Sequence, residues 1–231
     1  MDPQTLPAEA QELYQQLKKQ YRVGFESLKL TDDLKLYLLK ITDLEQVLGG
    51  KDPLKNPSEF PFWIRLWEAA IVLSRFMVTL APASGTTVLE LGAGLGAPGL
   101  TAAALGCSVT LSDYEDIILD FERVSAAASG LEGVRFEILD WLDPPEMERY
   151  DIILGAEVLF RDEFFTPLLD ILRHTLKPDG VTYLAHDSKR KSMHPFLEQA
   201  QKEYKISASR RILKNLDEDK EIILTRLTPR S

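Results

Sequence analysis

Three glycines at alternate positions follow a short apolar stretch near the middle of the chain. Residues 88–91 read Val-Leu-Glu-Leu, the glycines are Gly92, Gly94 and Gly96, and a helical pattern follows to about residue 104. Glycine tolerates positive φ, and its missing Cβ lets a ligand lie against the backbone. The free N–H groups at the start of the following helix face the same ligand. The pattern therefore predicts a strand, a tight turn and a helix N-terminus that bind a nucleotide-like ligand.

Two classes of nucleotide-like ligand are compatible with this turn. The glycines and Ala97 satisfy a relaxed dinucleotide fingerprint, and Asp113 follows at about the distance expected of a ribose-binding acid, so a nicotinamide-dependent oxidoreductase is one interpretation. Glu90 argues against it, because a carboxylate two residues before the first glycine would crowd a pyrophosphate. The same carboxylate suits a cationic ligand. S-adenosylmethionine carries an ammonium, a sulfonium and a ribose diol but no phosphate.

The stretch from Glu90 to Gly96 resembles the acid-x-Gly-x-Gly-x-Gly first motif of the seven-strand S-adenosylmethionine-dependent methyltransferases. Upstream of it, residues 66–70 read Leu-Trp-Glu-Ala-Ala, which resembles the Trp-x-Ala-Ala stretch of the protein-lysine N-methyltransferase branch of that family. The resemblance implies a Rossmann-like α/β fold, with a seven-stranded, mostly parallel sheet and a C-terminal antiparallel hairpin. It also implies S-adenosyl-L-methionine as the cofactor, a lysine side chain of a protein as the methyl acceptor, and Trp67 at the border of the cofactor.

Strand and helix patterns alternate after the glycine turn, which indicates a parallel sheet covered by helices on both faces. The expected strands are residues 108–112, 134–139, 150–155 and 181–186, and the expected helices are residues 115–128, 164–176 and 195–204. Two further strands, 205–213 and 221–227, are joined only by a short polar segment, so they are expected to be antiparallel. Residues 62–80 are expected to form one aromatic-rich amphipathic helix.

The first 60 residues are expected to form an extension to a methyltransferase domain that comprises residues 61–231. Residues 7–20 have the pattern of a polar helix with a sparse apolar stripe, and residues 23–30 and 34–41 have the pattern of a small β-hairpin. The segment 49–61 is rich in Gly, Pro, Lys and Asp and is the expected boundary or hinge.

Ligands in open α/β sheets bind outside the carboxyl ends of the strands, so each strand end is a candidate part of the site. Asp113 is expected to accept hydrogen bonds from the ribose hydroxyls, and the alternative is a solvated acid that opens the next helix. By resemblance, Asp140 binds the adenine amino group and Trp141 flanks the ring, with a purely structural role as the alternative for Trp141. The expected cofactor-binding residues are Trp67, Glu90, Gly92, Gly94, Gly96, Asp113, Asp140, Trp141 and Ala156.

The strand at 150–155 leads into Ala-Glu-Val-Leu-Phe, where the lysine-methylating families carry Asp-x-x-Tyr or Asp-x-x-Phe. Glu157 therefore has a longer side chain than the pattern. We expect Glu157 to hold the substrate ammonium and Phe160 to pack against its aliphatic stem, and these are the two expected catalytic residues. The expected reaction is in-line attack of a neutral amine on the sulfonium methyl. Desolvation in an aromatic-lined pocket favours the neutral amine, and alignment of the reactants supplies much of the rate enhancement.

Composition narrows the remaining classes of function. The net charge of −9 disfavours nucleic acid as a partner, because duplex binding needs clustered Lys and Arg. Cys107 is the single cysteine and the three histidines share no ligand-like spacing, so no metal site is expected. No apolar run approaches the roughly 20 residues that span a bilayer, and the first residues lack the pattern of a secretory signal. We therefore expect no membrane partner and a cytoplasmic location.

Two alternatives to protein-lysine methylation stay open. A small-molecule methyltransferase would use the same cofactor, with the first 60 residues as a lid over a closed pocket. A non-catalytic S-adenosylmethionine-binding partner protein would keep the fold without turnover, and the departure at Glu157 is the one feature that favours it. The sequence predicts neither the oligomeric state nor the target protein.

Overall fold

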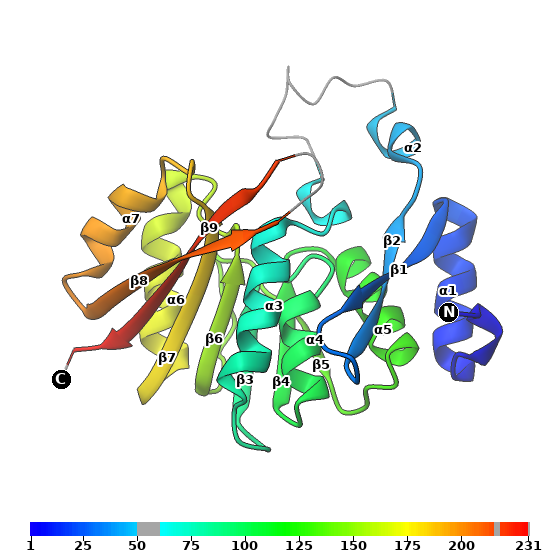
Figure 1. Ribbon diagram of the computed structural model, residues 1–231, viewed down its shortest axis with the longest axis horizontal. Helices are drawn as coiled ribbons and strands as arrows, with labels where there is room; N and C mark the ends of the chain where they lie inside the picture. The colour runs from blue at the N-terminus through cyan, green and yellow to red at the C-terminus, as the bar shows by residue number, and fades with distance from the viewer. Residues whose placement is uncertain (50–60, 215–217, 231) are drawn as a thin grey trace.

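The computed structural model describes residues 1–49, 61–214 and 218–230, and a seven-stranded sheet lies at its centre (Figure 1). The strands of this sheet are β3 (Thr87–Leu91), β4 (Ser108–Asp113), β5 (Arg135–Ile138), β6 (Tyr150–Ala156), β7 (Leu176–Asp187), β8 (Tyr204–Leu213) and β9 (Lys220–Pro229). Their order in space is β5-β4-β3-β6-β7-β9-β8.

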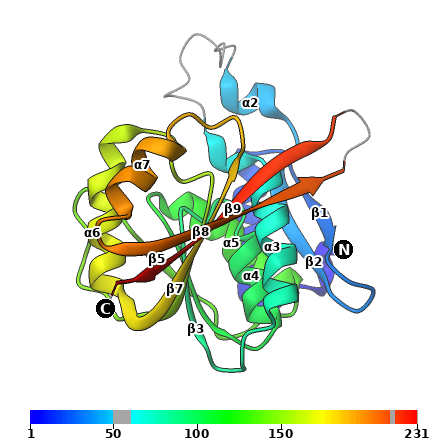
Figure 2. The same ribbon diagram turned by 60° about the vertical axis from the view of Figure 1, so that its left-hand side comes forward.

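Parallel pairs join β3 to β4 and β6, β4 to β5, and β6 to β7, whereas β9 runs antiparallel to both β7 and β8. This pairing confirms the predicted mostly parallel sheet with a C-terminal antiparallel hairpin, which forms a twisted ribbon along one edge (Figure 2). The chain runs from β3 to β4 on one side and later returns to β6 on the other. The strand order therefore reverses beside β3, and ligands of open α/β sheets bind beyond the strand ends at such a point.

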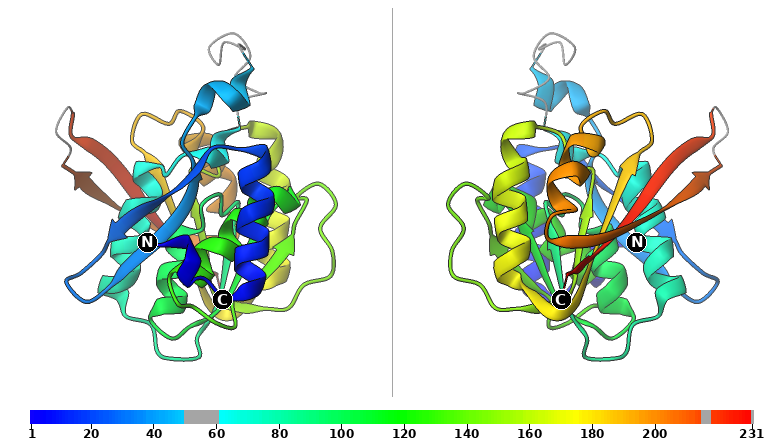
Figure 3. Two further views of the ribbon diagram at one scale, coloured as in Figure 1. Left: turned by 90° about the vertical axis from the view of Figure 1, so that its right-hand side faces the viewer. Right: turned by 90° about the vertical axis from the view of Figure 1, so that its left-hand side faces the viewer.

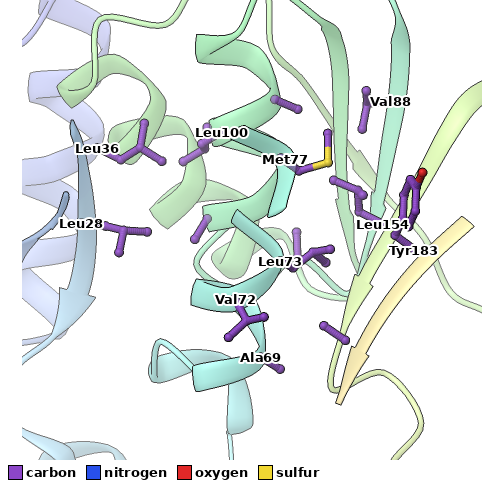
Figure 4. Packing of buried hydrophobic residues seen from close by; sticks show 14 of the residues in the cluster. Leu28, Leu36, Ala69, Val72, Leu73, Met77, Val88, Leu100, Leu154 and Tyr183 are labelled. Atoms are coloured by element: carbon purple, nitrogen blue, oxygen red, sulfur yellow. The ribbon is translucent and has the colours of Figure 1, made fainter. Parts of the chain in front are cut away.

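Helices cover both faces of the sheet, because successive strand residues point to opposite faces and both sets are apolar. Val88 belongs to the hydrophobic cluster on one face, and the next residue, Leu89, belongs to the cluster on the other. The first face is covered by α3 (Glu68–Leu80), α4 (Ala97–Ala104) and α5 (Asp116–Ala128), and the second by α6 (Phe165–Thr175) and α7 (Met193–Ala200). On the first face, Leu73 and Met77 of α3 are fully buried against Leu154 of β6 (Figure 4).

The N-terminal elements lie at one end of the molecule, and α6 and α7 lie at the opposite end (Figure 3). They are η1 (Pro3–Thr5), α1 (Ala8–Gln20), β1 (Val23–Lys29), β2 (Lys35–Ile41) and α2 (Leu44–Leu48), with β1 and β2 paired antiparallel. This confirms the predicted helix and hairpin. Two hydrogen bonds join β2 to α5: Leu39 N–H donates to Ser125 Oγ at 2.8 Å, and Tyr37 N–H donates to Ser129 Oγ at 2.9 Å. Of the segment predicted as boundary or hinge, residues 50–60 lie outside the described part.

The prediction of one helix over residues 62–80 is wrong. A short 3-10 helix, η3 (Phe62–Ile64), is followed by extended backbone, and α3 begins only at Glu68. The reason is that the two tryptophans pack in different places. Trp63 packs against Phe121 of α5, with ring centroids 5.1 Å apart, whereas Trp67 lines a surface pocket. In one continuous helix, side chains four residues apart would share a face and could not diverge in this way.

Smaller differences concern element ends. β7 begins at Leu176, earlier than the predicted strand at 181–186, and α7 ends at Ala200 rather than near residue 204. The connection between β8 and β9 includes residues 215–217, which lie outside the described part. Within the described residues, no helix combines the length and the apolar character needed to cross a membrane.

Candidate active site

The glycine turn lies between β3 and α4, at the carboxyl end of the central parallel strand. Gly92, Gly94 and Gly96 all have positive φ, of 57°, 59° and 70°, so side chains at these positions would strain the backbone. Gly96 is the N-cap of α4, whose first-turn N–H groups therefore begin directly at the turn. The structure thus contains the strand, turn and helix start that the motif predicts.

Glu90 supports the turn from within the protein. Its side chain is buried, and Oε2 accepts a hydrogen bond from Gly99 N–H in α4 at 2.7 Å. Burial raises the pKa of Glu90 to about 8, and the hydrogen bond from Gly99 opposes that rise. The carboxyl group therefore ties the end of β3 to α4.

Asp113 ends β4 and lies directly against the glycine turn. Its Oδ2 accepts from Gly94 N–H at 2.9 Å and its Oδ1 accepts from Tyr114 N–H at 2.8 Å. The residue is buried, and burial raises its pKa to about 6. The alternative of a solvated acid that opens α5 is wrong, because Asp113 is buried and the N-cap of α5 is Glu115.

Glu122 of α5 is a third buried acid beneath the turn, and it was not predicted from the sequence as part of the site. Its side chain is fully buried, and neither carboxyl oxygen has a hydrogen-bond partner among the described residues. Its Cγ lies 3.4 Å from the position that a Cβ at Gly96 would take. Burial, with the nearby charges of Asp113 and Glu90, raises the pKa of Glu122 well above its usual value. Its helical spacing from the apolar Ile118 was the signal that could have identified it.

An aromatic group borders the other side of the turn. Trp141 Cζ2 lies 3.3 Å from the position that a Cβ at Gly92 would take, and its ring contacts those of Phe160 and Phe164 at centroid distances of 6.3 and 5.6 Å. The structure therefore brings Trp141 and Phe160 together at the turn. Asp140 is exposed, and its Oδ1 accepts from Leu142 N–H at 2.9 Å in its own loop.

Glu157 follows the last residue of β6, Ala156, and has φ of +59°, a conformation that costs energy for a residue with a side chain. Its Oε1 accepts from Asp187 N–H at 2.6 Å, and its Oε2 forms an ion pair with the guanidinium of Arg190. Burial raises the pKa of Glu157, and Arg190 opposes that rise. The carboxylate that we expected to face a substrate ammonium thus already has a cationic partner.

Further hydrogen bonds hold the loop after β6 against the end of β7 and the segment that follows it. Leu159 N–H donates to His186 Nε2 at 3.2 Å, and the Ser192 hydroxyl donates to the Leu159 carbonyl. Burial, with the nearby charge of Arg190, lowers the pKa of His186 to about 3, so the ring is neutral. Neither Arg190 nor His186 was predicted from the sequence as part of the site. The Lys-Arg-Lys run at 189–191, directly after a strand, was the available signal.

Glu157 also lines a pocket of about 440 Å³ at the surface. The pocket is lined by Arg65, Trp67, Glu68, Glu157, Asp187, Lys189, Arg190, Lys191, Lys220 and Ile222. Trp67 lies there with its Nε1–H donated to the Phe62 carbonyl at 2.8 Å and the Arg65 guanidinium 4.8 Å from its ring centroid. At the glycine turn itself, it is Trp63 that lies near Gly94, with its Cα 3.6 Å from the position of an added Cβ.

Solved structures similar to this one include a TehB-like S-adenosylmethionine-dependent methyltransferase from Corynebacterium glutamicum. It aligns with a TM-score of 0.55 and 20% identity over 68% of this chain and 87% of that chain, which supports the fold.

Among curated proteins, Protein N-lysine methyltransferase METTL21A of Xenopus tropicalis is 32% identical over 139 residues, which are 58% of this chain and 64% of the relative. EEF1A lysine methyltransferase 3 of Mus musculus is 34% identical over 135 residues, which are 56% of this chain and 57% of the relative. The matches thus span less than two thirds of these two relatives. The family model described as lysine methyltransferase matches residues 63–203. That segment contains the glycine turn, Asp113, Glu157 and Arg190, and the chain belongs to the lysine methyltransferase family.

Proposed function

We propose that this protein is an S-adenosylmethionine-dependent protein-lysine N-methyltransferase. The observation that carries the proposal is the position of residues 157 and 158. Val158 Cγ1 lies 3.5 Å from the position of an added Cβ at Gly92, whereas Glu157 lines the surface pocket. Residues 157 and 158 therefore border both the glycine turn and a separate pocket. Methyl transfer from a cofactor to a second substrate requires two such adjacent sites. Family membership and the two lysine-methylating relatives support the same reaction.

The residues at the turn fit a cationic cofactor. Glu90, Asp113 and Glu122 are three buried acids at the turn, and burial raises the pKa of each. A positively charged ligand would favour their ionised forms, whereas a pyrophosphate would oppose ionisation. In this proposal, Asp113 and the N–H groups of the turn hold the ribose and amino acid parts, and Trp141 packs against the adenine. S-adenosylmethionine supplies a methyl group activated by its sulfonium. The assignments of Asp140, Ala156 and Trp67 to the cofactor stay predictions.

The remaining groups act on the acceptor. A lysine side chain has a pKa of about 10.4, so it must lose a proton to solvent before its lone pair attacks the methyl carbon. The cations of Arg190 and Lys220 in the pocket disfavour the ammonium form and thereby assist that loss. Glu157 then orients the neutral amine as a hydrogen-bond acceptor, and Phe160, which is 44% exposed, packs against the aliphatic stem. Orientation of this kind is a large part of catalysis in bimolecular transfers.

The proposal includes a protein substrate, no nucleic-acid or membrane partner, and a cytoplasmic location. The partner assignments rest on the net charge, and both the partner and the location assignments stay predictions. Methyl transfer to a small molecule is the competing activity of the same site.

The experiment is incubation of the purified protein with methyl-tritiated S-adenosylmethionine and a lysate from cells that lack it. We expect a discrete labelled protein band, and mass spectrometry of that band should place the methyl group on a lysine. Label only in the small-molecule fraction would support the competing activity. No label in either fraction, with cofactor binding shown by calorimetry, would support a non-catalytic cofactor-binding protein and contradict the proposal.

A further inference from the structure

The surface pocket beside Glu157 has the opposite charge balance to the chain as a whole. Five of its ten lining residues are Lys or Arg and three are acidic, whereas the chain has a net charge of −9. The cationic residues come from three separate segments: Arg65 precedes α3, Lys189, Arg190 and Lys191 follow β7, and Lys220 begins β9. These segments lie at one end of the molecule, at the top in Figure 1. The fold thus gathers positive charge at a single site.

Part of this positive charge is available to a partner, although Arg65 pairs with Glu68 at 3.0 Å. Lys189 pairs with Glu218 at 3.3 Å, but their side chains are 77% and 61% exposed. Glu218 is shared, since it also pairs with Lys220. Ion pairs exposed to solvent are weak and exchange partners at little cost. Lys191 is exposed as well. Arg190 differs, because it is held on the more buried carboxylate of Glu157.

The positive charge of the pocket would repel the ammonium form of the proposed acceptor lysine unless negative charges in the substrate offset it. A lysine that approaches as an ammonium meets Arg190 at Glu157 and further cations around the mouth of the pocket, so an isolated lysine is repelled. Negative charges next to that lysine in the substrate would offset the repulsion and steer the segment into the pocket. Complementary charge of this kind selects partners as well as accelerating their association.

We propose that the pocket binds protein segments in which the acceptor lysine is flanked by Asp and Glu, with Lys189, Lys191, Lys220 and Arg65 contacting the flanking carboxylates. The inference deepens the proposed function and rests on it. A nucleic acid is a poorer fit, because Glu68, Glu157 and Asp187 in the same lining would face its phosphates, whereas the peptide presents its central lysine to these acids.

The test measures binding of three fluorescein-labelled peptides to the 231-residue chain saturated with S-adenosylhomocysteine. Each peptide has one central lysine, flanked by Glu and Asp, by Ser and Gln, or by Arg. The double variant Lys189→Glu/Lys191→Glu reverses two exposed charges at the pocket. The matched control Lys18→Glu/Lys19→Glu makes the same charge change on the exposed C-terminal part of α1. A single-stranded oligonucleotide with the charge of the acidic peptide is the last probe.

We expect the acidic peptide to bind about tenfold more tightly than the neutral one in low salt, and the Arg-flanked peptide to bind most weakly. The preference should largely disappear at about 0.5 M salt, where screening acts within a few ångströms. It should also disappear in Lys189→Glu/Lys191→Glu and persist in Lys18→Glu/Lys19→Glu.

Equal binding of the three peptides, a preference that survives in the pocket variant, or tighter binding of the oligonucleotide would overturn the proposal. The binding test does not depend on turnover, so the two proposals can fail independently. Absence of methyl-lysine in the lysate experiment would contradict the proposed function and not the binding preference. Methylated lysate proteins whose target lysines lack acidic neighbours would also overturn the proposal while leaving the proposed function intact.

Discussion

The buried carboxyl group of Glu122 is the least compensated polar group near the candidate site. Neither of its oxygens has a partner among the described residues, and burial with two neighbouring acids raises its pKa. An acid whose pKa is higher in the folded state binds more protons folded than unfolded. Its contribution to the free energy of unfolding therefore falls as the pH rises above the unfolded value of about 4.3.

Glu122→Gln should accordingly stabilise the protein at pH 8, by about 1–3 kcal/mol, because an amide does not titrate and the cost of protonating or ionising the buried carboxyl group disappears. The gain should shrink toward pH 5, where the folded and unfolded carboxyl groups differ less in charge. Urea denaturation at both pH values measures this difference, with Glu132→Gln on an exposed loop as the control. An equal effect at the two pH values would show that the charge of Glu122 is irrelevant.

Asp113 gives a second pH dependence, in cofactor binding. Its pKa is raised to about 6, and in the proposed role its ionised form accepts hydrogen bonds from both ribose hydroxyls. Affinity for S-adenosylmethionine should therefore be constant above pH 7 and fall by about tenfold as the pH drops through 6. Calorimetric titration across this range checks the prediction. Asp113→Asn should bind weakly at every pH, and a pH dependence unchanged in that variant would assign it to another group.

Side-chain hydroxyl groups at the C-terminal end of α5 hold the N-terminal hairpin in place. On the edge of β2, Leu39 N–H donates a hydrogen bond to Ser125 Oγ. The Ser125 hydroxyl in turn donates to the Phe121 carbonyl at 2.7 Å. Ser125 is fully buried, so no water replaces it there. A side chain thus provides the partner that a further strand would otherwise supply.

Ser125→Ala should lower the free energy of unfolding by about 1–3 kcal/mol, because it leaves a buried N–H without an acceptor. Chemical denaturation measures the loss. Ser207→Ala on the exposed part of β8 is the control and should change stability little. A loss no larger than that of the control would mean that β2 does not depend on this hydrogen bond.

Elements that a local sequence pattern determines were predicted correctly. Features that depend on tertiary contacts were not predicted. The glycine turn and the alternating strands and helices have their own signals, and the structure contains them. The break at 65–67 depends on Trp63 packing against Phe121, a residue more than 50 positions away. The pair of Glu157 and Arg190 depends on adjacent strand ends, β6 and β7, which no local pattern reveals.

At the scale of the whole molecule, the N-terminal elements complete the core rather than standing apart from it. Leu17 of α1 and Leu39 of β2 share a buried cluster with Phe121 of α5. We propose that the extension predicted over residues 1–60 and the domain predicted over 61–231 fold as one cooperative unit.

A chain that starts at residue 61 would expose this cluster and should lose several kcal/mol of stability, since each large apolar side chain uncovered costs about 1.5–3 kcal/mol. The full chain should unfold in one transition by both circular dichroism and tryptophan fluorescence. Two separate transitions, or a shortened chain that folds and binds cofactor normally, would show instead that residues 61–231 are autonomous.

Glu157 lines the acceptor pocket next to Val158 at the glycine turn, and we propose that it acts on the acceptor. The most direct measurement compares methyl transfer to the labelled lysate protein by the native chain, by Glu157→Gln and by the control Glu198→Gln on the exposed face of α7, all saturated with cofactor. We expect kcat/KM for the protein substrate to fall about 100-fold in Glu157→Gln alone, with cofactor affinity and unfolding midpoint retained. Undiminished transfer by a folded, cofactor-saturated Glu157→Gln protein would contradict this role of Glu157.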